Sequence, residues 1–278
     1  MTRAGWFEVL ADDDEGEGRG LPDDIRAVYG GDWKLRPAGE LPYVYSNFVV
    51  SRDGRVSFRV PGHSGGGAIS GHDERDRWLM GVLRARADAV VLGDGTVAAE
   101  PEHVWTAEAI YPSQARRFAE LREAEGRSAN PLQVIVSLTG YAGPSAMFDQ
   151  DDLEVLVVTP DPGAAAVDVG ALMAQLRGRG VETILCEGGP RLYGGLIASD
   201  IAFDEFLTLS PLVVGEADSG PRRPSLVEGT AFAPDAAPRA RLLSVRRGGD
   251  YLYLRSRYEG RVTQSPPPDV SSSTSPSS

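Results

Sequence analysis

The spacing of apolar residues along this chain switches repeatedly between the alternation typical of strands and the three- and four-residue spacing typical of helices. Short β-branched and aromatic runs bounded by turn residues predict strands, and longer runs with one apolar stripe predict helices. The predicted strands are 42–50, 88–92, 132–137, 153–159, 181–186, 203–214 and 241–258, and the predicted helices are 23–29, 73–87, 113–125, 169–179 and 192–198.

This order of elements predicts an α/β fold with a mostly parallel central sheet, flanked by helices, and antiparallel strands at its C-terminal end. Helices alternate with strands along most of the chain, and the last strands then follow one another with a hairpin signal at Gly248-Gly249-Asp250. We expect an acidic N-terminal extension (1–40), one main domain (41–260) and a disordered Ser/Pro-rich tail (261–278).

Composition and charge exclude several classes of protein. The formal net charge of −12 over 278 residues opposes non-specific binding to nucleic acid. No apolar run approaches the roughly 18–20 residues of a membrane span, and no signal peptide is visible, so we expect a cytoplasmic protein with no membrane partner. Cys186 is the only cysteine and Lys34 the only lysine, which excludes disulfides within the chain, cysteine-rich metal sites and Gly-Lys-Ser/Thr phosphate loops. We expect no bound metal.

The turn Glu187-Gly188-Gly189-Pro190 joins a predicted strand to a predicted helix. Proline suits the first helical position, and glycines let another molecule approach the backbone closely. Free N–H groups and the helix dipole favour an anion at such a place. The turn therefore indicates either a phosphate cradle or a tight strand-to-helix connection without a ligand.

A second glycine turn, Gly93-Asp94-Gly95-Thr96-Val97-Ala98, follows the predicted strand 88–92 and has the form G-x-G-x-x-A. A Rossmann dinucleotide site also requires a strand ending in an acidic residue about 20 residues later. That region holds Tyr111-Pro112-Ser113 instead, which argues against a Rossmann site. Two glycine turns after neighbouring parallel strands still predict one nucleotide-sized ligand in the crevice between them.

Four segments, taken in order, carry a resemblance to a known family. They are 42–47 (PYVYSN) with 51–55 (SRDGR), 83–85 (LRA) with 93–96 (GDGT) and Glu100, 187–190 (EGGP) with Leu192, and 204–205 (DE) with 209–211 (LSP). The chain resembles, over about residues 42–258, the reductase of riboflavin biosynthesis, which is the C-terminal domain of the bacterial bifunctional deaminase-reductase. That domain is similar in fold to dihydrofolate reductase.

The resemblance implies an NADPH-dependent reduction of a ribosylaminopyrimidine 5′-phosphate, in which hydride transfer to C1′ of the opened sugar gives the ribitylamino product. It also implies a homodimer. The deaminase of the bifunctional enzymes needs zinc-binding cysteines, which one cysteine cannot supply, so this chain is expected to be a reductase alone.

The resemblance further implies roles for individual residues. Glu187 is the candidate catalytic residue, expected to position the substrate, and no acid or base is assigned. The substrate-binding positions are Asn47, Asp53, Gly66, Arg84, Val104 and Glu187, and the cofactor-binding positions are Val49, Ala68, Thr96, Glu100, Ser137, Gly189, Pro190, Arg191, Leu192, Tyr193, Gly194 and Gly195.

Several of these residues also have simpler structural interpretations. Thr96 has the side chain of a helix cap, and Asp53 before Gly54 is typical of a hairpin turn. Arg84 has the character of a structural ion-pair partner. We expect Cys186 to be buried at a strand end and His103 to face solvent.

The chain departs from bacterial members of this family at two informative places. Bacterial members carry an arginine for the substrate phosphate shortly after the position of Glu100, whereas Val104-Trp105-Thr106-Ala107 contains none. Asn47 replaces a common lysine and resembles archaeal-type members, which reduce the still-aminated pyrimidine. Two alternatives stay open: a reductase of a dihydropterin or another substrate, and a non-catalytic nucleotide-binding protein. Arg191 is the candidate for a 2′-phosphate contact.

Overall fold

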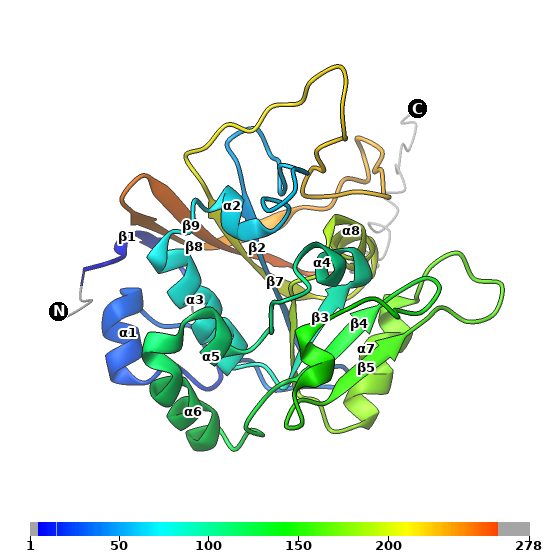
Figure 1. The fold of residues 1–278 in the computed structure, drawn as a ribbon. Helices are drawn as coiled ribbons and strands as arrows, with labels where there is room; N and C mark the ends of the chain where they lie inside the picture. Colours follow the sequence, from blue (N-terminus) through cyan, green and yellow to red (C-terminus); the bar gives the residue numbers. More distant parts are fainter. Residues whose placement is uncertain (1–4, 15, 261–278) are drawn as a thin grey trace, which may run out of the picture.

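A mixed sheet of nine strands, with helices on both faces, runs through the computed structural model, which describes residues 5–14 and 16–260 (Figure 1). The strands lie in the order β1-β8-β9-β7-β2-β6-β3-β4-β5. Their bounds are β1 Glu8–Asp12, β2 Tyr43–Val50, β3 Ala89–Gly93, β4 Leu132–Val136, β5 Val155–Val158, β6 Thr183–Cys186, β7 Phe203–Leu209, β8 Ala240–Gly248 and β9 Tyr251–Tyr258.

The six neighbouring strands from β7 to β5 are all parallel, whereas β9, β8 and β1 pair antiparallel to their neighbours. This arrangement confirms the α/β fold with a mostly parallel sheet and antiparallel C-terminal strands. The carboxyl ends of β2, β6, β3 and β4 lie at one edge of the sheet, because these strands are parallel and adjacent.

The helices form two layers, one on each face of the sheet (Figure 1). Residues of α1, α3 and α6 pack on the face that includes Tyr45, and residues of α7 and α8 pack on the face that includes Val44. The two cores alternate along β2, as the pleat of a strand requires. The helix bounds are α1 Asp23–Tyr29, α2 Gly66–Ile69, α3 Glu74–Ala85, α4 Asp94–Ala99, α5 Ala107–Ile110, α6 Ala115–Ala124, α7 Val169–Gly178 and α8 Pro190–Ala198.

The N-terminal segment, predicted as an acidic extension, contributes to this fold directly. Strand β1 adds to the sheet beside β8, and α1 packs against the first core. The indole of Trp33 is 1% exposed, and its ring centroid lies 5.0 Å from that of Tyr45 and 4.9 Å from that of Phe206.

Several elements begin or end at other residues than predicted. Strand β7 stops at Leu209 instead of residue 214, because Ser210 precedes Pro211, which cannot donate to a ladder. Helix α8 begins at Pro190, two residues before the predicted start. The predicted tail 261–278 lies outside the described residues. Within the described part of the chain, no helix combines the length and apolarity needed to cross a membrane.

Candidate active site at the carboxyl edge of the sheet

The two glycine turns of the sequence meet at the carboxyl edge of neighbouring strands β3 and β6. A Cβ built on Gly189 would lie 3.2 Å from Thr96 Oγ1, and a Cβ built on Gly93 would lie 3.4 Å from the Gly189 nitrogen. A Cβ on Gly188 would lie 3.2 Å from the Gly93 nitrogen. The two turns therefore touch, and glycine allows this close approach without displacing a neighbour.

Two helix N-termini start from these turns. Helix α8 has Pro190 at its first position, and helix α4 begins at Asp94. Neither N-cap residue, Gly189 or Gly93, supplies a side-chain hydrogen bond to the first turn of its helix. The first N–H groups of α8 thus have no intrahelical or side-chain cap, which suits an anion at this end of the helix. The residues fit the pyrophosphate of a nicotinamide cofactor.

Arg84 and Glu187 form a buried ion pair beside the turn. Arg84 Nη2 donates to Glu187 Oε2 at 2.7 Å, and Arg84 Nε donates to the same oxygen at 3.0 Å. The two side chains are 1% and 5% exposed. Glu187 follows β6 and Arg84 lies in the last turn of α3, so the pair joins two elements far apart in the sequence.

Asn47 and His103 complete the polar contacts of this pair. Asn47 Nδ2 on β2 lies 3.5 Å from Glu187 Oε1. Arg84 Nη1 lies 3.0 Å from His103 Nε2, and since a guanidinium only donates, this ring nitrogen accepts. The expectation that His103 faces solvent is wrong: its ring packs on Trp105, and burial together with Arg84 lowers its pKa to about 3. Neutral His103 therefore helps to orient Arg84.

Two further carboxyl groups lie close to the ion pair. Asp76 on α3 is buried and has no cationic partner among the described residues; its carboxylate accepts hydrogen bonds from Thr208 and Ser70, and burial raises its pKa to about 6. Burial also raises the pKa of Glu100, which lies near Arg84 and Glu187. Glu100 was expected here from the sequence, whereas Asp76 was not.

A second wall of the site comes from α2 and β2. A Cβ on Gly66 would lie 3.3 Å from Val49 Cγ1, and a Cβ on Gly65 would lie 2.2 Å from the Glu100 carboxyl group. Val49 and Gly66 thus lie against each other, and the neighbouring Gly65 lies against Glu100. The N-terminal end of α2 therefore brings an apolar contact from Val49 and the carboxyl group of Glu100 to the same side of the site.

Asp53 has a structural role in the loop that follows β2. Its carboxylate accepts hydrogen bonds from the Val214 and Gly215 nitrogens at 3.0 and 2.7 Å and from Ser51 Oγ at 2.6 Å. Although burial opposes ionisation, these bonds lower the pKa of Asp53 to about 2. The loop after β2 is thereby tied to the loop after β7.

Not every predicted site residue reaches the turn. Tyr193 is fully buried and donates its hydroxyl hydrogen to Glu205, and a Cβ on Gly194 would lie 2.6 Å from the Glu228 carbonyl oxygen. Gly195 packs towards Val169, and Val104 packs against the first core. Ser137 donates to Asp94 Oδ2 at 2.7 Å and so stays beside α4, whereas Arg191 is exposed at the start of α8.

The sequence of this chain is similar to a known protein family and to two named enzymes. The family described as the RibD C-terminal domain matches residues 42–254. A 2,5-diamino-6-ribosylamino-4(3H)-pyrimidinone 5′-phosphate reductase from Archaeoglobus fulgidus is 25% identical over 235 residues, covering 78% of this chain and 98% of the relative. The enzyme of the same name from Methanothermobacter thermautotrophicus is 23% identical, covering 64% of this chain and 82% of the relative.

Solved structures share the fold at lower identity. The deaminase/reductase of Thermotoga maritima has a TM-score of 0.57 and 19% identity, covering 79% of this chain. RibD of Acinetobacter baumannii has a TM-score of 0.55 and 18% identity, covering 84% of this chain. The match spans only 57% and 60%, respectively, of those longer proteins.

Proposed function

The chain belongs to the RibD C-terminal domain family, and from that membership we propose that it is a reductase of a ribosylaminopyrimidine 5′-phosphate in riboflavin biosynthesis. A nicotinamide cofactor supplies the hydride, which is transferred to C1′ of the substrate. The observation that carries the proposal is the convergence of the uncapped α8 turn with the buried pair of Glu187 and Arg84.

We propose that the chain's own residues bind and orient the two ligands. The backbone of Gly189 to Leu192 and the hydroxyl of Thr96 hold the cofactor phosphates, while Val49, Gly66 and Ala68 form the wall beside the nicotinamide. Glu187 and Asn47 present oxygen and amide groups to the substrate. Arg84 is a positioning residue, because its Nε, Nη1 and Nη2 already have acceptors in Glu187, His103 and the Thr106 carbonyl oxygen.

Within this function we propose that the diaminated pyrimidine is the substrate and NADPH the cofactor. Both archaeal relatives bear the name of the diaminated substrate, and Asn47 agrees with that substrate class. The exposed guanidinium of Arg191, at the start of α8, is the group that would contact a 2′-phosphate. A homodimer stays a prediction.

The test is NADPH oxidation by the purified chain with the diaminated and deaminated substrates offered separately. We expect turnover with the diaminated form, and strong loss of NADPH binding in Gly189→Asp, whose carboxylate would enter the phosphate turn against Thr96. Reduction of a dihydropterin but of neither pyrimidine would refute the assigned substrate. NADPH binding without turnover above a Glu187→Ala, Arg84→Ala control would refute the enzymatic function.

A further inference from the structure

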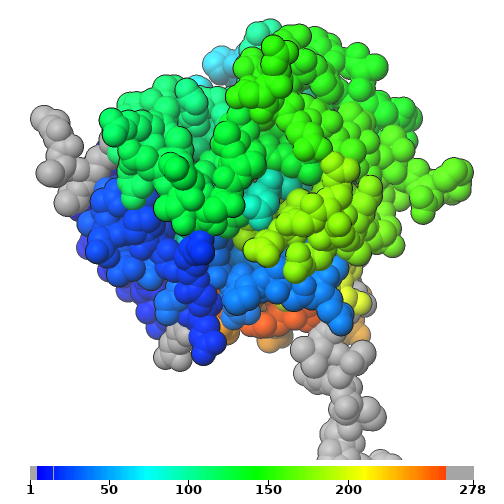
Figure 2. Space-filling view, turned by 90° about the horizontal axis from the view of Figure 1, so that it is seen from below, coloured from blue at the N-terminus to red at the C-terminus, as the bar shows by residue number. Residues whose placement is uncertain are grey.

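A polar cleft of about 320 Å³ lies at the opposite end of the sheet from the candidate active site. It is bounded by Gly18 and Arg19, by Leu35 to Ala38, by Glu125 to Arg127 and by the turn before β6. Figure 2 looks onto this face, where the N-terminal segment (blue), the chain around α6 (green) and the turn before β6 (yellow-green) meet. We name this the arginine cleft, after Arg19, Arg36 and Arg127.

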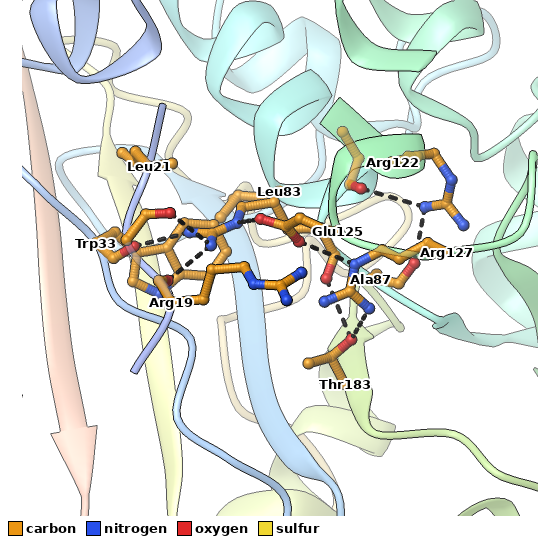
Figure 3. Close-up of polar contacts among 12 residues, drawn as sticks. Arg19, Leu21, Trp33, Leu83, Ala87, Arg122, Glu125, Arg127 and Thr183 are labelled. Atoms are coloured by element: carbon orange, nitrogen blue, oxygen red, sulfur yellow. Dashed lines mark hydrogen bonds and ion pairs between the residues drawn. The ribbon is translucent and has the colours of Figure 1, made fainter. Parts of the chain in front are cut away.

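Two of the three carboxylates that line the cleft are already neutralised by other residues, and the third, Glu182, is exposed. Glu125 accepts from Arg86 Nε at 2.8 Å and from Arg127 Nε at 3.0 Å. Asp88 pairs with Arg127 and also accepts from the Thr183 nitrogen at 2.8 Å and the Thr183 hydroxyl at 2.9 Å. Figure 3 shows the bonds among Glu125, Arg127 and Thr183. With these partners, Glu125 and Asp88 have little capacity left for further cations.

Two arginines at the cleft have no such partner. Within the part of the chain that the structure describes, the guanidinium groups of Arg19 and Arg36 make no hydrogen bond and no ion pair. In Figure 3 the guanidinium of Arg19 carries no dashed line and points towards that of Arg127. Arg19 contributes only its backbone to the neighbouring bonds, since its carbonyl oxygen accepts from Arg86 Nη2 at 2.8 Å.

The lining of the cleft balances three arginines against three carboxylates, and two more arginines, Arg86 and Arg122, lie behind it. Arg122, behind the cleft, is 3% exposed and donates only to Ser128 and to the carbonyl oxygens of Arg84, Ala85 and Ala87. Burial, with nearby Arg127, lowers its pKa to about 10. The arginines that line the cleft are Arg19, Arg36 and Arg127, and the carboxylates are Asp88, Glu125 and Glu182.

We propose that the arginine cleft binds a phosphate-type oxyanion between Arg19, Arg36 and Arg127. Guanidinium groups bind phosphate oxygens through paired, charge-assisted hydrogen bonds, and an anion here would give the guanidinium groups of Arg19 and Arg36 the acceptor that they lack among the described residues. The ligand would join the N-terminal segment to the strand ends. This site is separate from the proposed cofactor turn, and its existence does not depend on the proposed reductase function.

The test uses the full chain carrying Gly189→Asp, so that the cofactor turn does not compete for phosphate. Inorganic phosphate, pyrophosphate and AMP are titrated separately by calorimetry, which distinguishes a free anion from a phosphate ester. We expect one anion bound per chain by at least one probe, with affinity falling as chloride rises. Absence of binding by all three probes at millimolar concentration would overturn the proposal.

A double variant and a matched control locate the site. Arg19→Ala, Arg36→Ala should weaken binding by about tenfold or more, since it removes two charge-assisted donors. Arg116→Ala removes the same charge from an exposed position on α6, paired with Glu120, and should leave binding unchanged. Equal affinity in the double variant and the parent would refute the site. If Gly189→Asp does not fold, the double substitution Arg19→Ala, Arg36→Ala is made in the wild-type chain. That variant should bind one anion fewer than wild type, and an unchanged number of bound anions would refute the site.

Discussion

At the scale of single residues, the ion pair of Arg84 and Glu187 shows how the site combines stability with chemistry. Taking two charges out of water is costly, and removing one partner alone leaves the other charge buried, at a cost of about 3–5 kcal/mol. Here the guanidinium is held by the His103 ring nitrogen and a backbone carbonyl as well as by the carboxylate. Glu187 thus keeps a fixed orientation towards the sheet edge.

Asp76 gives the first prediction, which concerns pH. Its pKa in the folded chain is about 6, against an ordinary value of 3.8, so the folded state binds this proton more tightly than the unfolded state. Its contribution to stability is present at low pH and is lost as pH rises through about 6. The free energy of unfolding of Asp76→Asn should therefore rise relative to that of wild type as pH increases. The total change in this difference, from low pH to a pH above the folded pKa, should be on the order of 3 kcal/mol.

The measurement for Asp76 is urea denaturation across this pH range. The exposed variant Asp151→Asn serves as the control and should track wild type at every pH. A stability difference between Asp76→Asn and wild type that stays constant with pH would contradict a raised pKa at this position. The new amide changes the absolute stability, so the pH dependence is the decisive quantity.

The sequence predicted some site residues but not others, for a physical reason. Gly189 and Pro190 carry a local signal, because glycine and proline have distinct backbone properties. Asp76 and His103 carry no local signal of this kind, because an aspartate in a helix and a histidine in a loop are usually expected to be exposed. Their burial depends on β7 and on α3, which are distant in the sequence.

At the scale of elements, helix α8 has close contacts at its first turn and at its middle. Its first turn lies against α4 at the candidate cofactor site, and its middle packs against the segment around Glu228. The strand and helix pattern predicted α8 and the parallel strands beside it, because each element shows its own periodicity. It could not predict the packing of Tyr193 and Gly194, since Tyr193 bonds to Glu205 on β7 and Gly194 meets the long loop after β7.

The second prediction is that Gly194→Ala destabilises the fold although alanine is the better helix former. The new Cβ would lie 2.6 Å from the Glu228 carbonyl oxygen, so the helix or the loop must move. We expect a loss of about 1–3 kcal/mol in the free energy of unfolding. Gly178→Ala, at the end of α7 with open space around its Cβ, is the matched control and should be neutral or stabilising. Equal stability of the two variants would show that α8 is not constrained by this loop.

At the scale of the whole molecule, the N-terminal segment completes both the sheet and the core. Asp12 lies 2.7 Å from Arg246 and Asp14 lies 2.5 Å from Arg255, and both arginines are buried strand residues. The indole of Trp33 makes an edge-to-face contact with the ring of Tyr45. The Trp33 carbonyl oxygen accepts a hydrogen bond from Arg86 Nη1 at 2.7 Å. The acidic composition of this segment thus supplies counter-ions to the C-terminal strands, a role that depends on contacts more than 200 residues apart in the chain.

The third prediction is that residues 41–260 do not form a stable domain by themselves. Deleting residues 1–40 exposes the core beneath Trp33 and leaves Arg246 without its carboxylate, and an uncompensated buried charge is strongly destabilising. We expect the deletion to abolish cooperative unfolding. Because a truncated chain can fail to express for other reasons, Trp33→Ala tests the same packing by substitution and should cost about 3–5 kcal/mol, with Trp33→Phe costing less. A truncated chain that melts cooperatively at the wild-type temperature would instead show that the main domain is independent, and the N-terminal segment would then serve only the arginine cleft.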